Sequence, residues 1–560
     1  MRKIDWLIIF FIIVSSVFSL KDLFKPNFYT SHDGIHQVVR LYYFDQALRD
    51  GQIPPRWAGS LLNGYGYPLF VFSYQFPWFI AEPLHLSGLS IFDSIKMTFL
   101  VGFMLSGVTM YIFQKELFGR LAGFVGTILY LYAPYRFSNI FVRAAIGDAT
   151  SFIFPPLLFL ALYKVRKSKN LVWTWIVIAS LSLSAILLSH AMVFLFFLLS
   201  YLIYALFFFI FSRNKKLFFI SNIFIIILGF GIASYYFIPS LVERNFTKFD
   251  QIMSSAFIGK AVLNLKDLLY SPWGYGMMHA KEGGMSFQVG IAQWIVVFLS
   301  TILIIIFLIK RLKRAKFDNL LEGVFFLMLF ILSILIMLPV SRSFWQILSK
   351  FVLIDFPWRI LALTIFSASI LAGFVISRIK FRYFFTILII VLAIYGNRNH
   401  LRINKTLDWS LPFYLQLEKT TNSYDEYTPR WVRSDIVEKP RPKIEPSDKN
   451  AIVKISKSKS NLLEFTISTD LGGLVRLNSI YYPGWNVFLN DREVNISYDS
   501  GLIEFIIDRG ESRVVAKFTE TPLRKTSNII SLSSLGIISF IFINQVKRSI
   551  FIIKNSSTKR

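Results

Sequence analysis

Apolar positions along the chain gather in long runs that are separated by clusters of charge. A bilayer core about 30 Å thick needs about 17–25 mostly apolar residues per helix. The pattern predicts a polytopic α-helical membrane protein with about twelve transmembrane helices. The runs lie at 4–20, 95–113, 120–135, 149–165, 171–189, 191–211, 217–238, 288–309, 322–339, 359–377, 382–396 and 527–545. Those at 120–135 and 382–396 are short for a span, so either could be a re-entrant or tilted piece.

The positions of Lys and Arg predict the orientation, because short cytoplasmic loops accumulate these residues. When twelve helices are threaded, the basic clusters fall on one side of the membrane, and both termini are then cytoplasmic. The clusters lie at 2–3, 115–120, 164–169, 213–216, 310–316, 378–382 and 547–560. Lys21, Asp22 and Pro26 follow the first run without a small-residue cleavage site, which predicts a retained helix rather than a signal peptide.

The apolar stretch 65–86 is assigned to the first external loop, because counting it as a span would invert every later connection. Pro68, Pro77 and Pro83 interrupt it, and it is rich in aromatic residues. This composition is typical of a segment that lies at the membrane interface or packs against other helices. The threading leaves four connections on the outer side, at 21–94, 136–148, 239–287 and 397–526.

Residues 450–519 change from long apolar runs to short alternating runs separated by Gly, Asn and Asp. This spacing predicts an antiparallel β-sandwich, with a hairpin turn at Asn490-Asp491-Arg492. Residues 419–449, rich in charge and proline, are a connecting region. The predicted parts are a multi-spanning transmembrane domain (1–396), an extracytoplasmic C-terminal β-sandwich domain with its linker (397–526), and a last transmembrane helix with a basic cytoplasmic tail (527–560).

Composition agrees with a chain whose main solvent is lipid. Of the 560 residues, 54% are hydrophobic and 17% are charged, against about 45–50% and about 25% in soluble proteins. The net charge is +27. The chain has no cysteine, which excludes disulfides, thiolate metal sites, iron–sulfur clusters and cysteine nucleophiles. Membrane lipid is an expected partner and nucleic acid is not.

The sharpest polar motif is Ser31-His32-Asp33-Gly34, just beyond the first apolar run and before an amphipathic stretch. Two interpretations of Asp33 stay open. Its carboxylate could cap the helix that follows, or it could be catalytic. His32 and His36 have the i, i+4 spacing of some metal sites, but the helix start between them argues against shared ligation, so no zinc site is expected.

A second motif joins Arg143 and Asp148 in the connection between the third and fourth runs. Ionisable groups at such depth indicate function, although an ion pair that merely holds two helices together is the simpler alternative. Arg143 could bind a phosphate through two hydrogen bonds, and Asp148 could orient Arg143 or bind substrate. Arg359 could do the same or act as an interfacial anchor. His190, between two tight runs, could bind a substrate hydroxyl or, more simply, satisfy the backbone of the turn.

Two further outer motifs contain acidic and aromatic residues that could contact a sugar. The first holds Glu282, and the second holds Glu426 and Tyr427. Each could equally be ordinary loop chemistry, and neither is specific by itself.

Taken together, these residues resemble a known family. One helix, an external loop with an acidic residue soon after it, and many further helices are similar to the GT-C class of membrane glycosyltransferases. In detail the chain resembles the bacterial 6-pyruvoyl-tetrahydropterin-synthase-related and YfhO-like membrane proteins. The matching pieces are His32-Asp33-Gly34, Pro55-Arg56-Trp57, Asn63-Gly64-Tyr65-Gly66, 143–148, Ser189-His190, Phe356-Pro357-Trp358-Arg359, Glu426-Tyr427-Thr428-Pro429 and Tyr481-Tyr482-Pro483-Gly484-Trp485.

The resemblance implies transfer of a sugar, on the outer face of the cell membrane, from a polyprenyl-phosphate-linked donor to an envelope glycan, lipid or protein. Asp33 occupies the place of the general base. Such families often carry Glu where this chain has Asp148, whose side chain is one methylene shorter. A divalent cation, Mg²⁺ or Mn²⁺, stays open, because some relatives use one. No metal-binding His cluster accompanies the pterin part of the family name.

Two other classes of function remain. In a transporter or flippase of lipid-linked saccharides, Arg143, Asp148 and His190 would line a pathway rather than a reaction centre. In a non-catalytic assembly scaffold, the β-domain would bind glycan. The three hypotheses diverge at Asp33, which only the transferase needs as a base.

Overall fold

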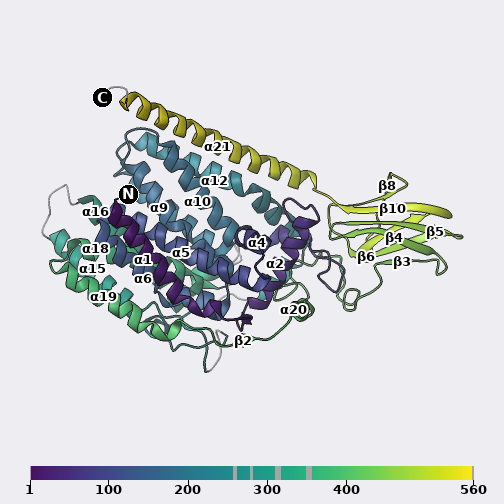
Figure 1. The fold of residues 1–560 in the computed structure, drawn as a ribbon, viewed down its shortest axis with the longest axis horizontal. Coiled ribbons are helices and arrows are strands. Elements are labelled where there is room, and N and C mark those ends of the chain that lie inside the picture. The colour runs from purple at the N-terminus through teal and green to yellow at the C-terminus, as the bar shows by residue number, and fades with distance from the viewer. Residues whose placement is uncertain (1, 257–261, 278–281, 310–316, 349–355, 558–560) are drawn as a thin grey trace.

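The computed structural model describes residues 2–256, 262–277, 282–309, 317–348 and 356–557. All twelve apolar runs form helices, which pack side by side (Figure 1). The helices are α1 (Lys3–Ser19), α5 (Ile91–Phe118), α6 (Arg120–Leu131), α8 (Ile146–Ser151) with α9 (Phe154–Lys167), α10 (Trp173–Ser189), α11 (Ala191–Phe209), α12 (Lys215–Glu243), α15 (Ile291–Ile309), α16 (Phe317–Met337), α18 (Leu361–Arg378), α19 (Arg382–Gly396) and α21 (Pro522–Ser557).

Within the described residues, eight helical segments are long and apolar enough to cross a membrane. They are Ile91–Phe118, Ile146–Lys167, Ala191–Phe209, Lys215–Phe246, Ile291–Ile309, Asn319–Met337, Pro357–Arg378 and Pro522–Gln545. The runs at 120–135, 171–189 and 382–396 form the shorter apolar helices α6, α10 and α19. The protein is therefore mostly helical with several candidate spans, and the count of twelve stays a prediction.

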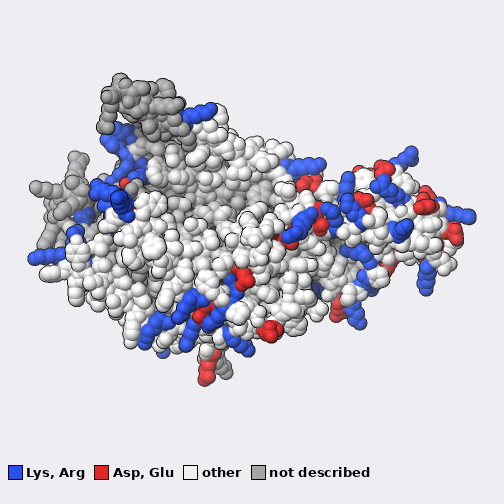
Figure 2. Space-filling view, in the orientation of Figure 1, with Lys and Arg blue, Asp and Glu red and all other residues white. Residues whose placement is uncertain are grey.

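Basic side chains gather at the end of the bundle where the N-terminus lies (Figure 2). Asp5, at the start of α1, pairs with Lys115 at 3.3 Å and with Arg120 at 2.9 Å, so two of the predicted basic clusters meet there. Lys164, at the end of α9, pairs with Glu116 at the same end. The cluster at 310–316 lies outside the described residues. Which side of the membrane this end faces stays a prediction.

The region predicted as a first loop is largely helical. It contains β1 (Phe28–Tyr29), α2 (Gly34–Arg49), α3 (Leu69–Phe72) and α4 (Phe76–Leu86). The stretch 65–86 packs against other helices, since α3 contacts α12 and α4 contacts α5 and α10. Such packing suits a sequence in which prolines break any longer helix.

The predicted connection 136–148 is not an exposed loop but a buried helical segment. A short helix, α7 (Pro134–Phe137), continues into a π-helical turn (Ser138–Arg143), and α8 follows. Tight helical turns of this kind satisfy their own backbone polar groups, which an irregular loop buried among helices could not do. Further short helices are η1 (Lys21–Phe24), η3 (Arg244–Phe246), α13 (Phe249–Ala256), α14 (Leu265–Leu269), η5 (Pro339–Ser341), α17 (Arg342–Leu348), η6 (Pro357–Ile360), η7 (Arg398–His400) and α20 (Leu411–Leu417).

The C-terminal β-region consists of two antiparallel sheets that enclose buried apolar side chains (Figure 1). Asn490 and Asp491 have φ of 47° and 67° and connect β7 to β8, which confirms the predicted hairpin turn. One sheet has the order β4-β5-β10-β7-β8 and the other β3-β6-β9; β2 (Thr406–Leu407) pairs separately with β1. The strands are β3 (Ile444–Pro446), β4 (Ile452–Lys459), β5 (Leu462–Thr469), β6 (Gly473–Ile480), β7 (Trp485–Leu489), β8 (Arg492–Val494), β9 (Leu502–Ile507) and β10 (Gly510–Phe518).

A buried ionic group joins the β-region to the helices. Glu243, at the end of α12, accepts hydrogen bonds from Arg524 Nε at 2.8 Å and Nη2 at 2.7 Å, and from the Tyr482 hydroxyl at 2.9 Å. We call Glu243, Arg524 and Tyr482 the junction cluster. Trp57, from the first loop region, packs edge-on against Trp485 beside it. These contacts fix the position of the β-region relative to the bundle.

Candidate active site

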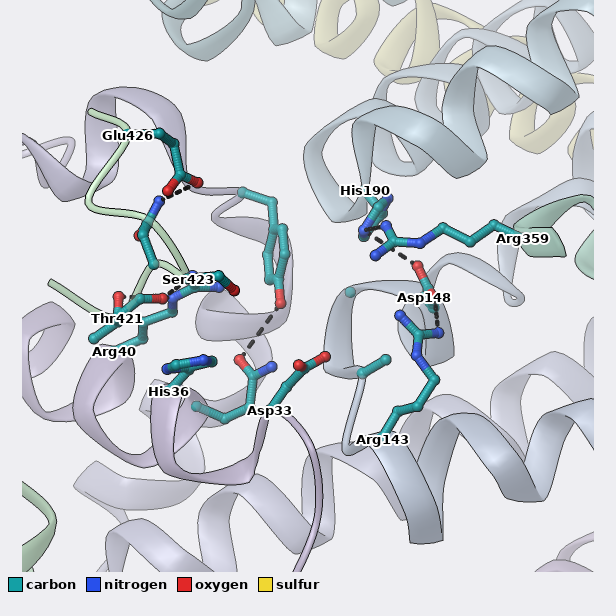
Figure 3. Close-up of a pocket in the computed structure, with 15 residues that line it drawn as sticks. Asp33, His36, Arg40, Arg143, Asp148, His190, Arg359, Thr421, Ser423 and Glu426 are labelled. Carbon is teal, nitrogen blue, oxygen red and sulfur yellow. Dashed lines mark hydrogen bonds and ion pairs between the residues drawn. The ribbon is translucent and has the colours of Figure 1, made fainter. Parts of the chain in front are cut away.

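A polar cavity of about 160 Å³ lies where the first loop region, three helix ends and the linker before the β-region meet (Figure 3). Six of the residues singled out in the sequence line it. The lining consists of Asp33, His36, Gln37, Arg40, Tyr74, Arg143, Ala145, Gly147, Asp148, His190, Arg359, Thr421, Asn422, Ser423 and Glu426.

The pocket lies at the end of the bundle opposite the basic clusters. Asp148 is in the first turn of the segment Ile146–Lys167, whose other end carries Lys164. Arg359 likewise begins the segment Pro357–Arg378, which ends on a basic residue. The threading therefore places the pocket and the β-region on the same side, as the sequence predicts for the outer polar residues.

Asp33 occupies the N-cap position of α2, but its side chain makes no capping hydrogen bond. The capping interpretation is therefore wrong. The backbone of this turn is fixed instead by the π-helical turn, because Asp33 N donates to Arg143 O at 2.8 Å and His32 N donates to Val142 O at 3.0 Å. A Cβ on Gly34 would meet Ser31 Oγ at 2.3 Å and Phe28 Cε1 at 2.7 Å, so a larger residue here would require these side chains to shift. The Asp33 carboxylate points into the pocket (Figure 3).

Arg143 and Asp148 form an ion pair in which Nη1 and Oδ2 are 2.5 Å apart. Arg143 ends the π-helical turn and Asp148 lies in the first turn of α8, so the pair joins two consecutive helical segments. Arg143 Nη1 also donates to Asn139 Oδ1 at 2.6 Å, and the guanidinium stacks over Trp358 at 4.7 Å. Burial disfavours the charged form of Arg143, but Asp148 beside it outweighs burial and raises the pKa of Arg143.

Two further charged or titratable side chains beside Asp148, those of His190 and Arg359, come from two other helix ends. His190 Nε2 lies 2.6 Å from Arg359 Nη1 and 3.3 Å from Asp148 Oδ1. Arg359 is only 8% exposed, so it is not a snorkelling interfacial anchor. A Cβ on Gly147 would meet Ser189 O at 2.5 Å, so glycine lets the turn before His190 approach α8. We call Arg143, Asp148, His190 and Arg359 the pocket cluster.

His190 satisfies the backbone of the turn, which is the simpler of the two alternatives that the sequence left open, and the contact with a substrate hydroxyl stays a prediction. Its Nδ1 accepts from the backbone N–H of Met192 at 3.2 Å, which satisfies the start of α11. Its Nε2 forms a hydrogen bond with Arg359 Nη1 at 2.6 Å, which joins His190 to the rest of the pocket cluster.

Arg40 and the linker segment 421–426 form the opposite wall of the pocket. Arg40 Nε donates to Thr421 Oγ1 at 3.1 Å, and its Nη2 donates to Thr421 O at 2.7 Å. Glu426 Oε1 accepts from Asn422 Nδ2 at 2.9 Å. The labelled residues of this wall and those of the pocket cluster lie on opposite sides in Figure 3, with Asp33 between them.

Three residues singled out in the sequence do not line the pocket. His32 lies next to Asp33, but its Nε2 is 3.2 Å from the carbonyl oxygens of Tyr275 and Gly276. Burial lowers the pKa of His32, so its neutral form is favoured. Glu282 is exposed outside the pocket. Tyr427 is stacked between two phenylalanine rings, at centroid distances of 4.5 and 5.3 Å.

Other pocket residues were not predicted from the sequence. His36 and Arg40 lie one turn apart on α2, which is the spacing that puts two side chains on one helix face, and this was the available signal. Tyr74 stands near Gln37, with its hydroxyl 3.4 Å from Oε1. Residues 421–423 carry no motif, and only the folded linker brings them to the site.

The side chains of the pocket do not form a preorganised metal-binding site. Among the residues that the structure describes, no group of three or more His, Cys, Asp or Glu side chains is placed to hold one ion. In the pocket, Asp148 is engaged by Arg143 and Glu426 lies on the opposite wall. The divalent cation that the resemblance leaves open stays a prediction.

Comparison with known proteins yields a family match. Residues 72–404 match the model of the 6-pyruvoyl-tetrahydropterin synthase related domain, described as a membrane protein. An uncharacterized protein of Lactococcus lactis subsp. cremoris (strain MG1363) is 24% identical over 250 residues, which are 42% of this chain and 39% of that protein. The chain thus spans well under half the length of this relative.

Two solved structures are similar at low sequence identity. The arabinofuranosyltransferase AftD from Mycobacteria gives a TM-score of 0.49 at 10% identity, over 72% of this chain and 27% of that one. The Archaeoglobus fulgidus oligosaccharyltransferase in the apo form gives a TM-score of 0.47 at 12% identity, over 76% of this chain and 61% of that one. The family match confirms the resemblance to membrane proteins of this family.

Proposed function

The chain belongs to the 6-pyruvoyl-tetrahydropterin-synthase-related family of membrane proteins, and we propose that it is a glycosyltransferase that moves a sugar from a polyprenyl-phosphate donor to an acceptor hydroxyl. One observation carries the proposal. A single pocket holds a carboxylate that caps no helix, Asp33, opposite a group with two arginines and a histidine. This is the pairing of a base and an anion site that the reaction requires.

Asp33 is the proposed general base. An acceptor hydroxyl is a poor nucleophile until its proton is removed, and a positioned carboxylate contributes about 10²–10⁴-fold. As the acceptor oxygen bonds to the anomeric carbon, its proton passes to Asp33. The bond between that carbon and the phosphate oxygen breaks at the same time. Attack from the face opposite the phosphate inverts the anomeric centre.

The pocket cluster is the proposed site of the donor phosphate. The leaving group is polyprenyl phosphate, which needs cationic stabilisation but no proton. Arg359 and His190 meet in the pocket, with Arg359 Nη1 2.6 Å from His190 Nε2, and Arg143 is partly neutralised by Asp148. Fixed donors of this kind act without reorganisation during the reaction. The donor tail is soluble in the bilayer, which accounts for a transferase built from apolar helices.

The test is sugar transfer by the purified full chain in liposomes supplied with radiolabelled polyprenyl-phosphate sugars and an envelope fraction as acceptor. Asp33→Asn keeps the size of the side chain and removes the base, so we expect a loss of about 10²-fold or more in transfer. Donor binding and the thermal midpoint should stay those of the native chain. Asp470→Asn, at an exposed carboxylate of the β-region, is the matched control.

The same liposomes separate the transferase from its rivals. A flippase would move labelled lipid between leaflets without forming a glycosidic bond, and Asp33→Asn would not abolish that movement. A scaffold would do neither. Undiminished transfer by Asp33→Asn would rule out the proposed base.

A further inference from the structure

The wall that faces the pocket cluster comes from the linker before the β-region, not from the membrane helices. Thr421, Asn422, Ser423 and Glu426 all line the pocket. In Figure 3 the labelled members of this wall lie across the cavity from Arg359 and His190. If the donor phosphate binds at the pocket cluster, the acceptor has to approach from the linker wall. Asp33, the proposed base, lies between this wall and the pocket cluster and has to contact the acceptor hydroxyl.

The wall is held in place from both sides. The Tyr67 hydroxyl, from the first loop region, accepts from Tyr427 N at 2.9 Å, and Leu62 N donates to the carbonyl oxygen of Lys419 at 2.7 Å. On the other side, Lys248 N donates to Thr428 O at 3.0 Å. A segment fixed by two different elements is organised before any ligand binds, so less ordering is needed when a ligand arrives.

Backbone strain marks the same segment. Thr421 has φ of 64° and Asp425 has φ of 51°, which is the left-handed region that a β-branched residue rarely adopts. Thr421 is held there by two hydrogen bonds from Arg40. Residues kept in such conformations concentrate at ligand-binding sites, because the surroundings must over-determine them.

The chemistry of the wall is that of a site for hydroxyl groups. It offers an amide, two hydroxyls and a carboxylate, and none of the four side chains is apolar. A sugar hydroxyl both donates and accepts, so it matches such a mixed set. The Oδ1 atom of Asn422 is buried and makes no hydrogen bond in the structure. A buried acceptor without a partner is costly, and a ligand hydroxyl would satisfy it.

We propose that residues 421–426 recognise the acceptor and that the acceptor is a carbohydrate, whose hydroxyls are bound by Asn422 and Glu426. The inference rests on the proposed transferase function and narrows its acceptor to one chemical class. A protein side chain or a simple lipid alcohol presents one hydroxyl and would leave most of these polar groups without partners.

The first arm of the test identifies what receives the sugar. The full chain in liposomes is given radiolabelled polyprenyl-phosphate sugars and the envelope fraction of a strain that lacks this gene. Linkage analysis of the labelled product then shows which atom carries the new bond. We expect a bond to a hydroxyl of another sugar. A bond to an amino-acid side chain or to a lipid alcohol overturns the inference and leaves the proposed function standing.

The second arm measures the wall directly. Asn422→Ala and Glu426→Gln should each raise the KM for the envelope fraction about tenfold, which is the loss expected for one or two hydrogen bonds. The KM for the donor should not change. Glu438→Gln alters an exposed carboxylate of the same linker and is the matched control. Thermal midpoints near that of the native chain show that the variants fold.

The outcomes separate the inference from the function on which it rests. An unchanged KM for the acceptor in both variants, with normal transfer, overturns the inference alone. Absence of transfer by the native chain overturns the proposed function and this inference with it.

Discussion

The junction cluster and the pocket cluster are both buried ionic groups, but they differ in the balance of their charges. Both oxygens of Glu243 accept charge-assisted hydrogen bonds from Arg524, and Tyr482 adds a third. In the pocket, Asp148 pairs with Arg143 through Oδ2 and lies 3.3 Å from His190 Nε2 through Oδ1, and Arg359 lies beside them. The junction cluster has one arginine for one carboxylate. The pocket cluster carries more cationic groups than its single carboxylate can balance and opens onto a cavity.

This difference shows which buried charged groups indicate a functional site. A buried ion pair by itself is weak evidence for function, because structural pairs are equally buried. What distinguishes the pocket cluster is its excess of cationic groups beside a space that a ligand can enter.

The largest expected effect comes from breaking the junction cluster. Glu243→Gln leaves Arg524 buried without its counter-ion, which should lower the free energy of unfolding by about 3–5 kcal/mol. The thermal midpoint of the full chain in detergent measures this loss. The triple variant Glu243→Leu, Arg524→Met, Tyr482→Phe should regain most of it, since a buried pair is often replaceable by apolar residues. An unchanged midpoint in Glu243→Gln would contradict the structural role.

The pocket cluster should respond in the opposite way. Arg359→Gln removes one cation that faces the proposed leaving group, so transfer should fall by about 10²–10³-fold, while the thermal midpoint changes little. The assay is the liposome transfer described above, and a parallel melt in detergent is its control. A large loss of stability without a specific loss of transfer would place Arg359 with the junction cluster instead.

The smallest effect is expected where the same pairing occurs in water. Arg433 and Asp435 form an ion pair at 2.8 Å, with 74% and 61% of their side chains exposed. Solvent screens such a pair, so Asp435→Asn should change neither the thermal midpoint nor transfer measurably. A clear loss in either measurement would show that pairing matters here regardless of burial.

The sequence predicts the helices and strands well because their patterns are local. Each of the twelve apolar runs lies in a helical region, and alternation with turn residues identified the strands from β4 to β10. Length alone could not decide which helices span the bilayer. The buried segment 136–148 was predicted as a loop, because its polar residues lie close together and its hydrogen bonds are made by a π-helical turn that no simple period indicates.

Part of the candidate site was predicted because its residues also stand out in the local sequence. Asp33, Arg143 and Arg359 stand out because charges are rare next to apolar runs. Sequence proximity misled in the case of His32, since neighbouring residues at a helix start can point to different elements. Asn422 could not be predicted, because the linker reaches the pocket only through contacts made by distant residues such as Tyr67 and Lys248.

The origin of one pocket wall in the linker bears on any exchange of C-terminal regions between members of the family. A chimera joined at the start of β4, near residue 452, would keep the host's own wall and swap only the sheets. One joined ahead of Glu418 would import a foreign wall together with them. The crossover point, rather than the β-region itself, would then decide whether the hybrid inherits the substrate preference of its donor.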